Sequence, residues 1–294
     1  MPSKPSSRSS SSGFTLLELM VAAVLGLLIG AMCVNSALVQ RRVFAGDSVR
    51  TRLNQNLRGA LDVIVSDGRV AGENLSAALP AVELAAGGGG PDELVLRRNL
   101  SSSVLNLCTA ISAGSSISQI YFANSATAAG CIYSAEAPKY SAWRAYRLAH
   151  GGSVDAFIYD PAKRKGEFFV YAGEGSSSTR YWITRSAGSF TGAYPKGSWI
   201  YLLEEWRYRL AGDVLQVVEN GRSAAPYNVG FGFTGFAAEV LLQDGSVRTS
   251  FGGGDDWTKI RRIALTLSAA ERFEHGVMTR TSGAHFFPRN VLSN

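Results

Sequence analysis

The feature that most constrains this chain is a long apolar run close to its N-terminus. The run covers residues 14–39, with the sequence FTLLELMVAAVLGLLIGAMCVNSALV, and no polar residue occurs between Leu19 and Val34. As a helix, these residues would extend about 39 Å, which exceeds the hydrocarbon core of a bilayer at about 30 Å. The run therefore predicts a helix that crosses a membrane.

The segment in front of this run is polar. Residues 1–13 read MPSKPSSRSSSSG, which is rich in serine, contains two basic residues and lacks acidic ones. An ordinary secretory signal carries its cleavage site after the apolar region. Here the Gly13-Phe14 junction lies before that region. Cleavage at this junction would remove the basic leader and leave the helix on the mature protein, which would then stay in the membrane.

Glu18 is the only charged residue in the apolar run. A carboxylate inside hydrocarbon costs a few kcal/mol, so we expect it to have a partner. One candidate partner is the amino group that cleavage would create on Phe14 of a neighbouring subunit in a packed array of helices. The alternative is a glutamate near the membrane interface, where the helix dipole favours negative charge at the helix N-terminus. The residues alone leave both explanations open.

Gly13, Phe14 and Glu18, at this spacing between a basic leader and an apolar helix, resemble the class III signal of type IV prepilins and pseudopilins. The resemblance implies that a prepilin peptidase cuts after Gly13 and methylates the Phe14 amine, and that Glu18 guides subunit addition. It also implies a filament core of packed N-terminal helices. The implied location is the bacterial inner membrane, in a single pass with a periplasmic C-terminal domain, followed by the pilus and the cell surface.

The helix is predicted to continue through residues 40–75. Apolar residues recur there at four-residue intervals, which is typical of an amphipathic helix against a folded domain: Leu53, Leu57, Leu61 and Val65. We expect a bend or a melted turn at Gly46, because glycine costs about 1 kcal/mol in a helix. The helix is expected to end by about Gly72.

Beyond the helix, residues 76–141 are rich in Gly, Ala and Ser and are expected to form a loop-rich variable region with one or two strands. Residues 142–294 read as short strands separated by turns such as Asn220-Gly221, beginning with a strand at residues 143–149. The predicted fold class is α+β. It combines a long N-terminal helix, with a transmembrane half and an amphipathic half, and an antiparallel β-sheet domain, as in type IV pilins.

The chain has three cysteines. Cys33 lies in the apolar run, where a small hydrophobic residue is expected. If the domain is exported, Cys108 and Cys131 could form a disulfide in an oxidising compartment. The sequence does not establish that their Cα atoms lie close enough for this bond.

A second resemblance narrows the family. Residues 58–72, RGALDVIVSDGRVAG, look like the helix end of PilW-type minor pilins, although Gly68 stands where leucine is more usual. Three later segments are similar to the C-terminal pattern of that family: residues 206–221, 259–269 and 285–291. Residues 100–140 show no clear match. The GspJ-type minor pseudopilins of type II secretion share the overall plan and are the alternative.

The resemblance implies a minor pilin that helps to initiate pilus assembly and sits at or near the tip. Its implied partners are other minor and major pilins, the prepilin peptidase, the inner-membrane assembly machinery and a tip adhesin. A DNA-binding or adhesive pilin is a further alternative. The net charge of +6 comes from short scattered groups such as Lys163-Arg164-Lys165, which are typical of solvated surface rather than of a nucleic-acid site.

The sequence indicates no enzyme, no cofactor, no metal site and no small-molecule substrate. Residues 230–235, GFGFTG, match the dinucleotide pattern G-x-G-x-x-G, but strand-like residues follow where that site needs a helix. Asp255-Asp256 beside three glycines fits a charged hairpin turn better than a calcium loop, because alternating oxygen ligands are missing. The three histidines lie far apart in the sequence, which does not favour a catalytic triad.

Overall fold

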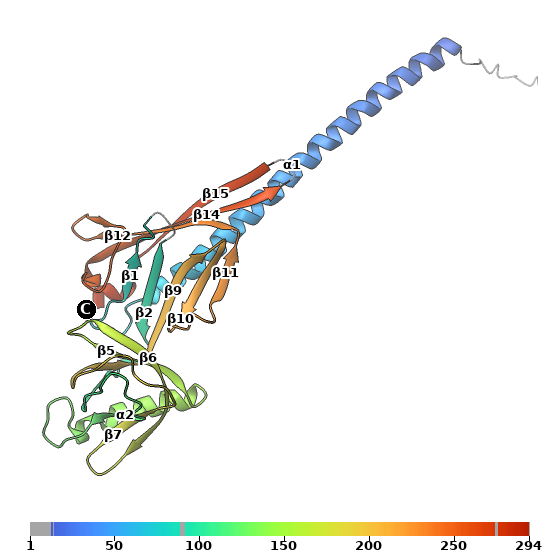
Figure 1. Ribbon diagram of the computed structural model, residues 1–294. Coiled ribbons are helices and arrows are strands. Elements are labelled where there is room, and N and C mark those ends of the chain that lie inside the picture. Colours follow the sequence, from blue (N-terminus) through green and yellow to red (C-terminus); the bar gives the residue numbers. More distant parts are fainter. Residues whose placement is uncertain (1–12, 14, 89–91, 274–275, 294) are drawn as a thin grey trace, which may run out of the picture.

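The computed structural model describes residue 13 and residues 15–88, 92–273 and 276–293. Its first element is a single helix of 55 residues, α1 (Leu16–Val70). In Figure 1 the first half of α1 projects away from the rest of the molecule, whereas the second half lies against β-sheets. We call residues 16–44 the projecting half of α1 and residues 49–70 the packed half. The predicted helix end near Gly72 is confirmed.

The melted turn expected at Gly46 is wrong, because α1 is helical throughout this region. Local bonds support the helix on both sides of the glycine. The Ser48 hydroxyl donates to the Ala45 carbonyl at 2.8 Å, and the Thr51 hydroxyl donates to the Asp47 carbonyl at 2.9 Å. A glycine penalty of about 1 kcal/mol does not interrupt a helix that is continued by long stretches on either side.

The packed half of α1 buries one face, as the four-residue spacing predicted. Eight of its residues are buried: Val49, Leu53, Leu57, Ala60, Leu61, Ile64, Val65 and Gly68. All of them except Gly68 join the larger of two hydrophobic cores found among the described residues, together with residues of the first two sheets described below. This burial holds the domain on the helix.

Two antiparallel sheets form this larger core. The five-stranded sheet has the order β1-β2-β9-β10-β11. Its strands are β1 (Val82–Ala85), β2 (Glu93–Asn99), β9 (Leu203–Ala211), β10 (Val214–Glu219) and β11 (Tyr227–Phe231). The four-stranded sheet has the order β13-β12-β14-β15. Its strands are β12 (Phe233–Leu242), β13 (Val247–Arg248), β14 (Ile260–Phe273) and β15 (Gly276–Phe286).

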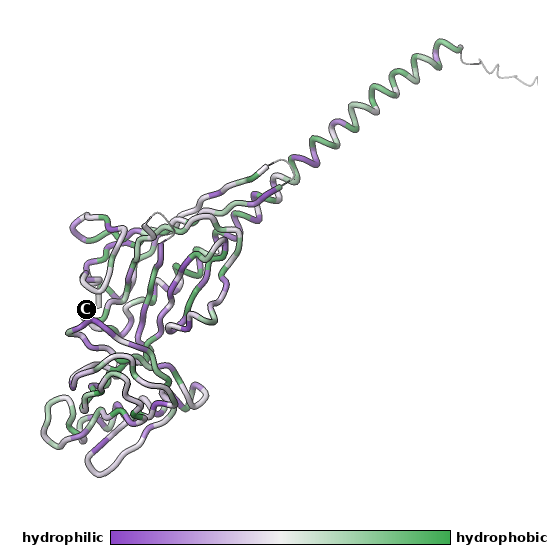
Figure 2. The backbone as a smooth tube through the Cα atoms, viewed as in Figure 1, coloured by the Kyte–Doolittle hydropathy of each residue, from purple (hydrophilic) through white to green (hydrophobic). Residues whose placement is uncertain are grey.

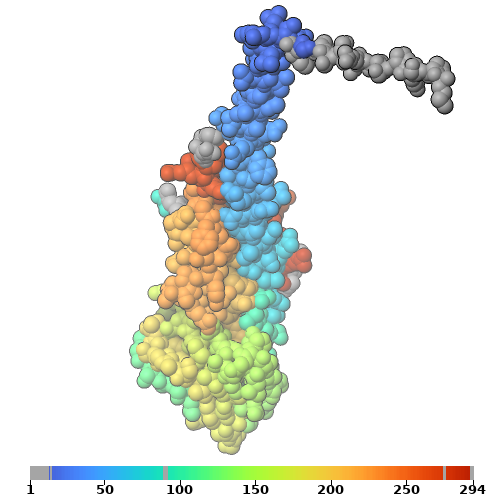
Figure 3. Space-filling model, turned by 90° about the vertical axis from the view of Figure 1, so that its right-hand side faces the viewer, coloured from blue at the N-terminus to red at the C-terminus, as the bar shows by residue number. Residues whose placement is uncertain are grey.

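The third sheet belongs to a separate lobe with its own core, and its order is β3-β8-β5-β6-β7-β4. Its strands are β3 (Leu105–Asn106), β4 (Gln119–Ala123), β5 (Val154–Asp160), β6 (Lys165–Ser176), β7 (Tyr181–Arg185) and β8 (Trp199–Tyr201). Helix α2 (Tyr133–Ala149) packs on it through the buried Trp143. We call this part the distal lobe, because Figures 1 and 3 place it at the opposite end of the molecule from the projecting half of α1.

The strand predicted at residues 143–149 is wrong, since these residues form the second half of α2. The segment fits two periods. Trp143, Ala145 and Arg147 alternate as in a strand, but Tyr140, Trp143 and Arg147 also share one helix face. The helical face is the one used: Tyr140 stacks on Tyr181 with ring centroids 4.6 Å apart, and Arg147 pairs with Glu174 at 2.7 Å.

The C-terminal segment closes the end of α1 through two short 3₁₀ turns, η1 (Trp257–Lys259) and η2 (Arg289–Ser293). Gly68 lies under the Phe286 ring, where an added Cβ would come within 2.2 Å of that ring. The Asn290 amide donates to the carbonyls of Val70 and Ala71, both at 3.2 Å, and so caps the helix. A leucine at residue 68 would leave no room for Phe286, which explains the glycine at this position.

Taken together, one long helix and three antiparallel sheets make the fold α+β and type IV pilin-like, as predicted. Strands connect the two lobes: β8 belongs to the distal lobe and β9, which follows after Leu202, belongs to the five-stranded sheet. The G-x-G-x-x-G match runs from the end of β11 into β12, with Gly232 at a φ of 76° between two different sheets. Its glycines serve the crossing from one sheet to the other.

Candidate functional site: the start of helix α1

A capping box starts α1. Thr15 is the N-cap residue, and its hydroxyl oxygen accepts a hydrogen bond from the Glu18 backbone N–H at 3.3 Å. In return, Glu18 Oε2 accepts from the Thr15 backbone N–H and from the Thr15 hydroxyl, both at 3.1 Å. This reciprocal arrangement satisfies two backbone donors that a helix N-terminus otherwise leaves without partners.

The Glu18 carboxylate is therefore partnered within its own subunit, through one of its two oxygens. Among the described residues, Oε1 has no hydrogen-bond partner. The side chain is exposed, and the first turn places its negative charge at the positive end of the helix dipole. Of the two explanations that the sequence left open, the isolated subunit displays the local one. Oε1 remains available to a donor from another chain.

The role of Thr15 was not predicted from the sequence. The pattern Thr15-x-x-Glu18 in front of an apolar run is the signature of a capping box and could have revealed it. Gly13 is exposed and lies outside the helix. Phe14, the residue predicted to carry the new amino group, lies outside the described residues. The peptide bond predicted to be cut thus precedes the N-cap of α1.

The projecting half of α1 exposes its apolar side chains on every face. Its most apolar window of 18 residues has a mean hydropathy of 2.4 and is not buried anywhere against the protein. Figure 2 shows the corresponding change along α1, from a mainly hydrophobic first half to a mixed second half. An exposed apolar surface of this extent marks a membrane or protein contact. By length and composition, this helix can cross a membrane.

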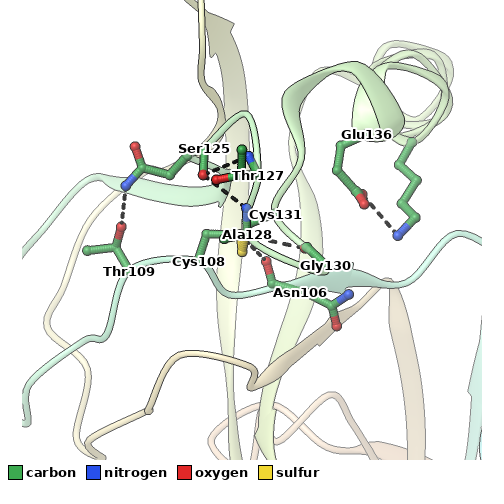
Figure 4. Close-up of a disulfide and its surroundings, with 11 residues drawn as sticks. Asn106, Cys108, Thr109, Ser125, Thr127, Ala128, Gly130, Cys131 and Glu136 are labelled. Atoms are coloured by element: carbon green, nitrogen blue, oxygen red, sulfur yellow. Dashed lines mark hydrogen bonds and ion pairs between the residues drawn. A yellow bond between two sulfur atoms is a disulfide. The ribbon is translucent and has the colours of Figure 1, made fainter.

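Cys108 and Cys131 are joined by a disulfide in the distal lobe, with Cα atoms 5.7 Å apart (Figure 4). The bond ties the segment after β3 to the segment that leads into α2. Ser125 shapes the intervening loop, because its hydroxyl oxygen accepts hydrogen bonds from the N–H groups of Thr127 and Ala128 at 3.0 and 3.1 Å. Cys33 is free and exposed on the projecting half.

Comparison with known proteins gives a match in one region. The family model for the prokaryotic N-terminal methylation motif matches residues 8–34, which include the leader end, the Gly13-Phe14 junction, Glu18 and much of the apolar helix. No curated protein and no solved structure matches the chain.

The motif and the helix together support a type IV pilin-like protein, either a pilin or a pseudopilin, that is anchored in a membrane. The motif implies processing by a prepilin peptidase and association with pilus components. It also suggests a structural rather than an enzymatic role.

Proposed function

We propose that this chain is a minor pilin of a type IV pilus, which helps to initiate assembly and sits at or near the tip with other minor pilins. The observation that carries the proposal is the methylation motif on a helix whose apolar half has no buried contacts within its own subunit. Such a helix needs first a membrane and then neighbouring helices to cover it. A filament core of packed helices supplies the second environment.

In the proposed mechanism, the peptidase cuts after Gly13 and methylates the amine of Phe14. Residues 14–39 hold the subunit in the inner membrane, with the folded domain in the periplasm. Glu18 then guides docking. Oε2 keeps the first turn of α1 capped through Thr15, while Oε1 accepts a charge-assisted hydrogen bond from the Phe14 amine of the neighbouring subunit. The same Glu18 carboxylate then both caps its own helix and pairs with the amine of the neighbouring subunit.

The position of the distal lobe supports a place at the tip. This lobe lies past the C-terminal end of α1, in line with the long axis of the molecule (Figure 1). When the helices of successive subunits pack in parallel, each displaced along the filament axis by a constant distance, the subunits nearer the tip occupy the space beyond the C-terminal end of α1. A subunit at the tip has no such neighbours, so an additional lobe there meets no steric conflict. The additional lobe beyond the end of α1 therefore favours a subunit that caps the filament over one that is repeated along its shaft.

Mass spectrometry of sheared surface pili and of an inner-membrane fraction tests the proposal. We expect a methylated peptide that begins at Phe14 in both fractions, at low abundance in the pili, and reduced piliation and twitching in a deletion strain. A processed peptide found only in the membrane fraction, with normal pili and lost protein secretion, would instead identify a GspJ-like pseudopilin. An uncut leader in both fractions would refute the reading of Gly13 and Glu18.

Two substitutions separate the two uses of Glu18. Glu18→Gln keeps an oxygen that can accept from the Thr15 N–H but removes the negative charge, whereas Thr15→Ala removes the cap hydroxyl and keeps the charge. We expect Glu18→Gln to be processed normally and to be absent from pili. Thr15→Ala costs about 1 kcal/mol of helix stability and should still reach the pili. Equal incorporation of Glu18→Gln and the unchanged protein would show that the charge does not guide docking.

A further inference from the structure

The β5–β6 hairpin carries a group of charges that the proposed function leaves without a role. Its turn presents three consecutive cations, Lys163, Arg164 and Lys165, all exposed. Within the described part of the chain, none of the three side chains has an ion pair or a hydrogen bond. Arg164 holds a φ of 52°, a left-handed conformation that is uncommon outside glycine. The turn thus gathers three cationic side chains without ion pairs at one point of the surface.

This turn forms one border of a cleft of 590 Å³ between the two lobes. Figure 1 shows β5 and β6 at the junction of the distal lobe with the part of the molecule that holds the five-stranded and four-stranded sheets. Apolar side chains line part of the cleft, among them Leu79, Pro80, Phe157 and Phe168. A smaller hollow of 200 Å³ adjoins it and shares Lys165, Gly192 and Tyr194 with it. The surface therefore combines an apolar wall with a cationic edge.

The carboxylates of the cleft already have partners. Arg97 donates to Glu205 at 2.6 Å and to Glu83 at 3.1 Å, with its own side chain buried. Glu167 accepts three hydrogen bonds from Thr191 and Gly192, at 2.7 to 3.1 Å. Because these acids are held by the protein itself, they are not free to neutralise the cations of the turn. An external anion would meet unpaired lysines at the edge.

Asp160 requires a hydrogen-bond donor, whereas the cations of the turn require an anion. It is 2% exposed and lines the smaller hollow. Its Oδ1 accepts from the N–H groups of Ala162 and Lys163 at 3.0 and 3.4 Å, while Oδ2 is buried without a hydrogen-bond partner among the described residues. A buried acceptor that lacks a donor costs about 1–3 kcal/mol. A ligand that fits here therefore supplies a donor as well as a negative charge.

We infer that this cleft binds an acidic peptide segment of another filament subunit. A peptide offers backbone N–H groups to Asp160, carboxylates to Lys163 and Lys165, and apolar side chains to the wall formed by Phe157 and Phe168. A DNA backbone offers only acceptors to the buried carboxylate and has no apolar part for the wall. The inference rests on the proposed function, because it takes the partner from the filament.

Site-specific photocrosslinking in living cells tests this, using the full chain with benzoylphenylalanine in place of Ala162, an exposed residue of the turn. The same label in place of the exposed Thr249 is the positional control. We expect an adduct from residue 162 whose partner peptide is rich in Asp or Glu, and none from residue 249. Lys163→Glu with Lys165→Glu should reduce the adduct at least tenfold, while Arg261→Glu with Arg262→Glu, an exposed basic pair elsewhere, should not.

Replacing the crosslinked acidic residues of the partner by lysine should restore the adduct in the strain with Lys163→Glu and Lys165→Glu. The inference is overturned by an adduct that ignores these charge changes, by a partner peptide without acidic residues, by crosslinks to DNA, or by no adduct while processed protein is present in the pili. Measuring the Phe14 terminus in the same cells separates these results from failure of the proposed function, which would leave the leader uncut.

Discussion

The two halves of α1 have the same secondary structure and both carry leucines, yet these leucines meet opposite surroundings. Leu28, in the projecting half, is 52% exposed, whereas Leu57, in the packed half, is 1% exposed. Full burial of a leucine contributes about 1.5–3 kcal/mol. In the packed half this energy stabilises the folded domain. In the projecting half it becomes available only when a membrane or neighbouring helices cover the side chain.

This difference shows that the features that make α1 helical are separate from those that decide what each half of α1 does. The capping box and an unbroken run of helix-compatible residues make α1 continuous. What each half does depends on what covers it. Paired substitutions in full-length protein in detergent micelles test this division.

The largest expected difference comes from Leu57→Ala and Leu28→Ala. Removing the buried side chain leaves a cavity in the larger core and should lower the free energy of unfolding by about 3 kcal/mol. Leu28→Ala should leave the free energy of unfolding of the domain unchanged. Urea unfolding followed by tryptophan fluorescence measures both values. Similar losses from the two substitutions would contradict the division of α1 into two functional halves.

The cysteines give a second contrast of nearly the same size. Cys108→Ser with Cys131→Ser removes a disulfide that spans 23 residues, which should cost about 3 kcal/mol. The loss should appear as faster amide hydrogen exchange in α2, which follows the disulfide loop. Cys33→Ser lies in the projecting half and is the matched control, with no change expected in the domain. Unchanged exchange in α2 of the double variant would mean that packing alone holds the distal lobe.

The sequence was most informative where a pattern was long or local. The apolar run and the buried face at residues 53–65 both predicted the observed helix. The Asn220-Gly221 turn was also predicted, and both residues have positive φ values. These features follow from periodicity and turn chemistry, which neighbouring residues determine among themselves.

Other features depend on contacts that no local pattern reveals. Residues 143–149 satisfy two periods, and only packing of Trp143 against the distal sheet selects the helix. Residues 76–141 were expected to hold one or two strands, which is wrong, because β1, β2, β3, β4 and the first half of α2 lie there and their sheet partners come from distant parts of the chain. The capping box was within reach of sequence reasoning. The cleft at the β5–β6 hairpin was not, since its residues come from several elements.

Glycines within α1 provide the third test. Gly68→Ala would place a methyl group within 2.2 Å of the Phe286 ring, and forcing the ring aside should cost about 1–3 kcal/mol. Gly59 has no atom within 4 Å of an added Cβ, so Gly59→Ala should stabilise the domain by about 1 kcal/mol through helix propensity. Urea midpoints that shift in opposite directions are the expected result. Stabilisation by both substitutions would show that Phe286 does not fix the end of α1.

The smallest expected effect concerns Asp67 on the packed half, whose carboxylate accepts a hydrogen bond from the Tyr208 hydroxyl. Burial raises the pKa of Asp67 above its ordinary value of 3.8, while the Tyr208 hydrogen bond lowers this pKa and partly offsets the effect. The folded protein therefore holds more protons on Asp67 than the unfolded chain does just above pH 3.8. The Asp67 contribution to the free energy of unfolding should fall as pH rises through this interval.

Asp67→Asn keeps an oxygen for Tyr208 and removes the titration, so this variant should lose that part of the pH dependence with little change in stability at acidic pH. Tyr208→Phe removes the donor and should destabilise the domain by about 1 kcal/mol, more at pH 7 than at pH 4, because only the ionised carboxylate then lacks its strongest partner. Unfolding curves at both pH values measure the difference. If Tyr208→Phe had the same effect at both pH values, the hydrogen bond between α1 and β9 would not depend on the charge of Asp67. Apolar burial alone would then distinguish the packed half from the projecting half.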